Sequence, residues 1–190
     1  MKHMFPALFL LTLMAGAVRT AAQVNPYKDG TPGVTGVRSE VLAMVMIQEN
    51  EFERLAEAMP ADKYTWRPSA GVRSVAEVFL HASAANYNMY KLVGVQPPAG
   101  LDVNGMEQST TDKTKIIAML KESYAHAKKA IMSVPDSDLE KTMDWRGGKI
   151  TERGILIYIV PHIGEHLGQA IAYARVLGVV PPWSVDPPKK

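Results

Sequence analysis

The chain has 190 residues, 47% of them hydrophobic, no cysteine and a formal net charge of +2. The absence of cysteine excludes a disulfide framework, and the length suits one domain with one core. The positive charge comes from residues 1–22, which contain Lys2 and Arg19 and no acidic residue. Without them the formal charge is zero and no basic cluster remains, so we expect no nucleic-acid partner.

Residues 1–22 have the pattern of a secretory signal peptide. Lys2 precedes an apolar stretch at 5–18, and small residues ending at Ala22 offer a cleavage site before Gln23. A membrane anchor is the alternative, but the apolar stretch is too short to span a bilayer comfortably. We therefore expect a secreted or periplasmic protein with no membrane anchor after cleavage.

The next two segments predict an extended lead-in and a first helix. Prolines and glycines at 23–36 are typical of extended chain, whereas apolar residues recur at helical spacing over 37–59. A second helix is predicted to start after Ser74, which can form a capping box with Glu77. His81 then lies on or beside the inward face of this helix.

The middle of the chain combines a long loop with a third helix. The loop at 93–110 is long enough to be a lid or a dimer contact, and a helix is expected at about 112–134. Residues 143–151 resemble a tight turn between two short extended pieces, with Gly147 and Gly148 supplying the positive φ angles.

The last predicted helix starts at Thr151, a potential N-cap, and runs to about Leu177. Gly178 fits the position that ends a helix in the left-handed conformation. Pro161 removes one backbone hydrogen bond, so we expect a bend immediately before His162.

Four helices with few strand signals predict an all-α protein, a four-helix bundle over 37–184. We expect up-down-up-down order with one or two longer crossings, a short hairpin-like turn before the last helix, and a tail at 185–190. The cores of such bundles often hold metal ligands that project from facing helices.

The sequence HIGEH places His162 and His166 four residues apart, on one stripe of a helix. Together with His81 from another helix, they could bind one metal ion and leave a coordination position open. The alternative is that these imidazoles hydrogen-bond to neighbours within the bundle or reach solvent at its end.

Two other metal motifs fit poorly. HIGEH matches the H-x-x-E-H pattern of inverted zincins, but no glutamate follows Glu165 to supply their third ligand. A ferritin-like di-iron site requires Glu-x-x-His pairs, and neither His162 nor His166 has a glutamate three residues before it.

The order of these segments resembles the DinB family, also called the DinB/YfiT-like metalloenzymes. The resemblance spans about residues 37–184. The matching segments are WRPS at 66–69, SVAEVFLH at 74–81, HIGEHLGQ at 162–169 and ARVLGVVPP at 174–182.

This resemblance implies a four-helix bundle with a three-histidine metal site, usually zinc or nickel, and frequent homodimers. His81, His162 and His166 match the ligand positions. Family members often have an arginine where this chain has Leu167, so no role of that arginine carries over. Relatives include thiol-S-transferases and a thiol-dependent maleylpyruvate isomerase, while most have no established activity.

We therefore expect an exported, metal-dependent enzyme, either a hydrolase or similar to thiol transferases, acting on a small molecule whose identity stays open. Gln169 could orient a ligand-bound water or the substrate. Glu165 could assist the metal site as a neighbouring partner or be a solvated charge. Export argues against cytoplasmic thiol cosubstrates. The second hypothesis is a non-catalytic helical module that binds a metal or ligand or forms dimers.

Overall fold

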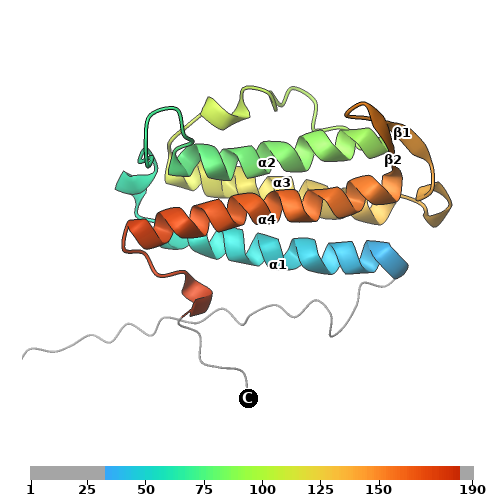
Figure 1. The fold of residues 1–190 in the computed structure, drawn as a ribbon. Coiled ribbons are helices and arrows are strands. Elements are labelled where there is room, and N and C mark those ends of the chain that lie inside the picture. Colours follow the sequence, from blue (N-terminus) through green and yellow to red (C-terminus); the bar gives the residue numbers. More distant parts are fainter. Residues whose placement is uncertain (1–32, 185–190) are drawn as a thin grey trace, which may run out of the picture.

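The computed structural model describes residues 33–184, so the predicted signal peptide, most of the lead-in and the tail lie outside it. Four helices form a bundle, and a two-stranded sheet lies at one end (Figure 1). This confirms the predicted fold class. The elements are α1 (Gly36–Ala58), α2 (Val75–Tyr90), α3 (Lys113–Ser133), β1 (Thr142–Trp145), β2 (Gly148–Thr151) and α4 (Glu152–Val176).

The order of helix directions differs from the predicted up-down-up-down arrangement. The connection over residues 91–112 returns along the whole bundle, so α2 and α3 run in the same direction (Figure 1). The start of α3 therefore lies beside the end of α1, where Lys113 Nζ donates to the carbonyl of Met59 over 2.8 Å. This long connection contains a 3₁₀ turn, η3 (Met106–Gln108), that packs on α2.

Buried aromatic rings from three parts of the chain lie at the centre of the bundle. Phe52 of α1 contacts Phe79 of α2 edge-on, with ring centroids 6.0 Å apart, and also contacts Tyr124 of α3 at 6.3 Å. All three side chains are fully buried. Each large buried side chain contributes on the order of 1.5–3 kcal/mol through the loss of apolar surface to water, and this packing sets the distances between the helices.

The predicted helix caps are present on both helices that carry the candidate ligands. Ser74 Oγ accepts from the Glu77 amide over 3.2 Å, and the Ser74 amide donates to the Glu77 carboxylate over 2.7 Å, which is a complete capping box. Thr151 accepts from the Gly154 amide at the start of α4. The sequence therefore determines where both helices that carry the candidate ligands begin.

In the hairpin before α4, only Gly147 of the two predicted glycines, Gly147 and Gly148, has a positive φ angle. The two residues of its turn, Arg146 and Gly147, have φ angles of 47° and 83°, whereas Gly148 already pairs with Trp145 in the sheet. Both turn residues must adopt positive φ because that twist matches the paired strands. The pairing register thus places Arg146 and Gly147 in the turn with positive φ, and Gly148 in the strand.

The fourth helix continues through Pro161 without a break. Pro161 is exposed, and Gln48 of α1 donates to the carbonyl of the preceding Val160 over 2.8 Å. The bend expected at this position stays a prediction. Gly178 follows the helix with φ 76°, as expected for its left-handed end. Within residues 33–184, no helix is long and apolar enough to cross a membrane.

Candidate metal centre

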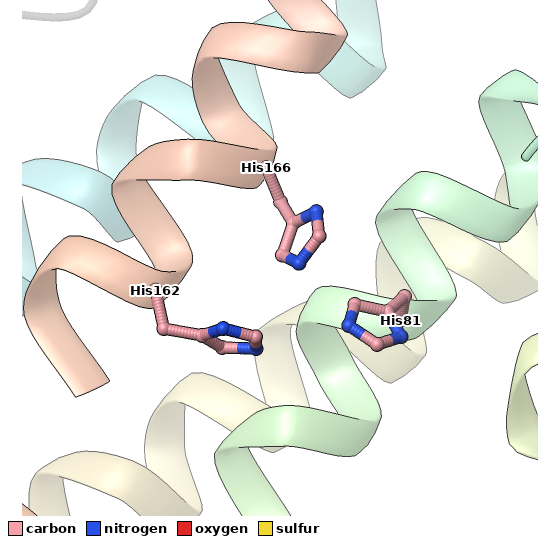
Figure 2. Close-up of side chains that lie close together, drawn as sticks. All are labelled: His81, His162 and His166. Atoms are coloured by element: carbon pink, nitrogen blue, oxygen red, sulfur yellow. The ribbon is translucent and has the colours of Figure 1, made fainter. Parts of the chain in front are cut away.

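His81 from α2 meets His162 and His166 from α4 between the two helices (Figure 2). The ring centroid of His81 lies 5.7 Å from that of His162 and 4.4 Å from that of His166, and the two α4 rings are 4.9 Å apart. One nitrogen of each ring can be chosen so that all three lie within 4.8 Å of one another. The predicted residues are therefore brought together in a group that could hold a metal ion.

The environment of the α4 pair favours the neutral imidazole that binds metals. Burial lowers the pKa of His162, and the positive charges of His166 and His81 lower it further. Burial also lowers the pKa of His166, while a hydrogen bond to Gln169 opposes this shift. Both rings therefore lose their protons at a lower pH than an exposed histidine would.

Glu107 orients the His81 ring. Its Oε2 atom lies 2.8 Å from His81 Nδ1, and because an ionised carboxylate only accepts hydrogen bonds, Nδ1 carries the proton. The other nitrogen, Nε2, then has a free lone pair for a metal ion. A carboxylate behind a ligating histidine is a frequent arrangement in metal sites because it fixes both the tautomer and the orientation of the ring.

Arg73 holds Glu107 in place. The Arg73 Nε and Nη2 atoms donate to the two carboxylate oxygens over 2.7 and 3.3 Å, a bidentate pair. Burial alone would raise the pKa of Glu107, but the hydrogen bonds from Arg73 and His81 outweigh it and lower that pKa. The carboxylate therefore stays ionised behind His81.

A second chain of hydrogen bonds orients His166. His166 Nδ1 lies 3.2 Å from Gln169 Oε1, and Gln169 Nε2 donates to the Tyr173 hydroxyl over 3.0 Å. The Tyr173 hydroxyl donates to the Arg73 carbonyl over 3.1 Å. Arg73 therefore connects to His81 through its side chain and to His166 through its backbone.

The two candidate catalytic residues have different surroundings. Gln169 is engaged by His166 and Tyr173, so the structure gives it an orienting contact, and its role toward water or substrate stays a prediction. Glu165 is exposed on α4, and its negative charge partly opposes the lowered pKa values of His162 and His166. Its predicted assisting role also stays a prediction.

Sequence reasoning missed Glu107 and Arg73. Glu107 lies in η3, within the loop predicted as a lid or dimer contact, and is separated from His81 by 26 residues. Neither residue belongs to a periodic pattern. The contact between Glu107 and His81 depends on the path of the loop, which the local sequence does not encode.

The donor set fits a divalent transition metal. Three neutral imidazoles suit zinc, nickel, copper and iron, and three protein ligands leave at least one coordination position for water or substrate. Hydrogen bonds at Nδ1 of His81 and His166 leave the Nε2 atoms of both rings available. Bundle, triad and orienting groups together define a class of helical protein with a candidate three-histidine metal centre.

Comparison with known families agrees with this class. The model of the DinB superfamily matches residues 47–170, so the chain belongs to the DinB superfamily. It is 23% identical over 144 residues to the uncharacterised protein YjoA of Bacillus subtilis strain 168, an alignment that covers 74% of this chain and 90% of YjoA.

Three crystal structures share the fold at low sequence identity. The DinB-like protein YjoA of Bacillus subtilis aligns with a TM-score of 0.59 and 18% identity, covering 73% of this chain and 92% of its own. A DinB-like protein of Bacillus cereus gives 0.61 and 16%, covering 71% and 89%. A conserved protein of Enterococcus faecalis gives 0.63 and 16%, covering 76% and 99%.

Proposed function

We propose that this protein is an exported metal-dependent enzyme in which His81, His162 and His166 bind one divalent ion, zinc or nickel. The observation that carries this proposal is the convergence of three imidazoles from two helices, two of them with Nδ1 already engaged. Such an ion, when bound, lowers the pKa of a coordinated water or thiol and supplies a nucleophile near neutral pH.

The protein groups around the centre would keep the ligands in place. Glu107 and Arg73 hold His81 in one tautomer, and Gln169 with Tyr173 holds His166. Rings whose orientation is fixed in advance lose little entropy on binding. Gln169 and Glu165 remain the candidates for orienting the reacting water or substrate and for moving its proton.

We favour a hydrolytic reaction on a small molecule over thiol transfer, because export would separate the enzyme from the thiols of the cytoplasm. Export is proposed from residues 1–22 alone, and cell fractionation tests it: full-length protein in the cytoplasm would contradict it. We also propose a homodimer on the basis of the family resemblance, and light scattering of the purified protein would measure its mass.

A non-catalytic binding module is the second candidate. Two observations favour it: the Glu107 carboxylate is already occupied by Arg73 and His81, and Glu165 is exposed. A base held against the open coordination position would favour catalysis. Among residues 33–184, neither carboxylate is held in this way by a hydrogen bond to His162 or His166.

Metal analysis of untagged protein tests the shared part of both candidates. We expect about one zinc or nickel ion per chain, and less than about 0.1 after reconstitution with either metal would contradict the site. His81→Ala and His166→Ala should both abolish stoichiometric binding. His126→Ala is the matched control, because His126 lies on α3 beside Tyr87 and outside the triad.

Activity distinguishes the two candidates once the metal content is known. The loaded protein should be screened against ester, amide and thiol-transfer substrates, with His166→Ala as the background. Turnover that disappears in this variant supports an enzyme. Stoichiometric metal without turnover across the screen supports the binding module.

A further inference from the structure

The turn of the β1–β2 hairpin places a cation near the start of the metal-ligating stripe of α4. The guanidinium carbon of Arg146 lies 5.2 Å from the ring centroid of Trp145 and 5.3 Å from that of Tyr158. Tyr158 stacks on His162, with ring centroids 6.1 Å apart and planes inclined by 16°. One row of side chains therefore leads from Arg146 through Tyr158 to the candidate metal centre.

Arg146 occupies an unfavourable backbone conformation in the hairpin turn. Its φ of 47° is the only positive φ of a non-glycine residue within residues 33–184. The left-handed region is unfavourable for an ordinary L-residue, and such turn positions favour asparagine or glycine. The hairpin turn requires this conformation whatever residue occupies the position, so the choice of arginine rests on its side-chain contacts.

The Arg146 charge has no acidic partner among the described residues. By contrast, Arg38, Arg67, Arg73 and Arg153 each pair with a carboxylate. Asp144, two residues before Arg146, is paired with Lys149. The guanidinium at the hairpin tip is thus available for an anion from solution.

The aromatic neighbours prepare this guanidinium for a planar anion. Trp145 and Tyr158 contact each other edge-on at 5.5 Å, and the guanidinium lies over both rings as in cation–π contacts. These contacts restrict the long arginine side chain, while its N–H groups can bind a carboxylate through two parallel hydrogen bonds. The same rings offer an apolar surface to the body of the ligand.

We propose that Arg146, Trp145 and Tyr158 form a recognition site for the carboxylate of a small organic acid whose other end reaches the three-histidine centre. This inference rests on the proposed function and names its substrate class. The carboxylate binds the Arg146 edge, the apolar body crosses the Tyr158 ring, and the reacting group lies beside His162. Neutral molecules of the same shape bind more weakly because they lack the anionic end.

Paired metal-binding probes test this site without requiring turnover. Monohydroxamates of linear dicarboxylic acids bind the metal through the hydroxamate and carry a carboxylate at the other end. Alkyl hydroxamates of equal length lack that carboxylate. The full-length protein is first loaded with zinc and its metal content measured. Calorimetric titration with both series, from four to about eight carbons, then gives the affinity contributed by the carboxylate at each length.

We expect at least one chain length to gain about tenfold or more in affinity from its carboxylate. Arg146→Gln should remove this gain and leave the metal content and alkyl hydroxamate affinity unchanged. Arg153→Gln removes an equal charge from the first turn of α4 and should keep the gain. The proposal is overturned if no length gains, or if the gain survives Arg146→Gln.

Failure of the metal centre is recognised separately. Protein without metal, or without affinity for the alkyl hydroxamates, contradicts the proposed function and removes the basis of the carboxylate site with it. Protein that binds the metal and the alkyl hydroxamates but ignores the carboxylate contradicts only the role of Arg146. Loss of the carboxylate gain in both Arg146→Gln and Arg153→Gln would indicate general charge attraction and would also overturn the site.

Discussion

Glu107 Oε2 lies 2.8 Å from His81 Nδ1 and joins a loop residue to a candidate metal ligand on α2. The contact assigns the proton to Nδ1 and the lone pair to Nε2. The Glu107 carboxylate in turn accepts hydrogen bonds from Nε and Nη2 of Arg73. The loop over residues 91–112 therefore takes part in forming the candidate metal centre and does more than connect two helices.

Removing the Glu107 carboxylate should weaken metal binding. We expect Glu107→Ala to lower zinc affinity by about 10–100-fold, because His81 loses the partner that fixes its tautomer and orientation. Glu107→Gln should lose less, since an amide oxygen can still accept from Nδ1. Competition with a chromophoric chelator measures both. Glu140→Ala, which removes only an exposed pair with Arg153, should have no effect, and equal affinities for all variants would refute the orienting role.

The Tyr173 hydroxyl should stabilise the fold and support His166. Tyr173→Phe leaves the Gln169 amide and the Arg73 carbonyl without their partner, so we expect a loss of about 1–2 kcal/mol in unfolding free energy. Urea denaturation of metal-free protein measures it. Tyr90→Phe is the control, because the buried Tyr90 hydroxyl has no hydrogen-bond partner among the described residues and its removal should be neutral or stabilising. Equal effects of the two variants would contradict the network.

Metal affinity should resist mild acidification. Protons compete with the metal for the imidazoles, and the pKa values of His162 and His166 lie below the ordinary value of 6.5. The contribution of these two rings to the affinity should therefore change little as pH falls from 8 to that value, and then decrease as both rings gain protons. Zinc titrations across this range check the sign. A decrease of more than about tenfold per pH unit already above the ordinary value would need protons on at least two of the three rings and would contradict the lowered pKa values.

The capping box at the start of α2 should contribute measurably to stability. Ser74→Ala removes the acceptor for the Glu77 amide, and we expect a cost of about 1 kcal/mol. The urea midpoint should shift with an unchanged slope, because the surface exposed on unfolding stays the same. Ser69→Ala, at an exposed site in the preceding loop, is the comparison. A similar shift in both variants would mean that the cap contributes nothing specific.

Much of the candidate centre could be predicted from local pattern. The spacing of His162 and His166 on one helix follows from 3.6 residues per turn, and Ser74 and Thr151 mark the starts of both ligand-bearing helices through backbone amides that need acceptors. The hairpin was also recognisable, although strand pairing decided that Arg146 and Gly147 form its turn.

Other features required the folded chain. The direction of α3 depends on a connection that crosses the whole bundle, and no local preference encodes that path. The contacts of Glu107 with His81 and of Tyr173 with Arg73 join residues 26 and 100 positions apart. The sequence by itself determined the helices, their caps and the histidine pair, because these depend on neighbouring residues. Only the tertiary structure decided which groups orient the histidines and that Arg146 lies over Tyr158, because core packing sets the distances between elements.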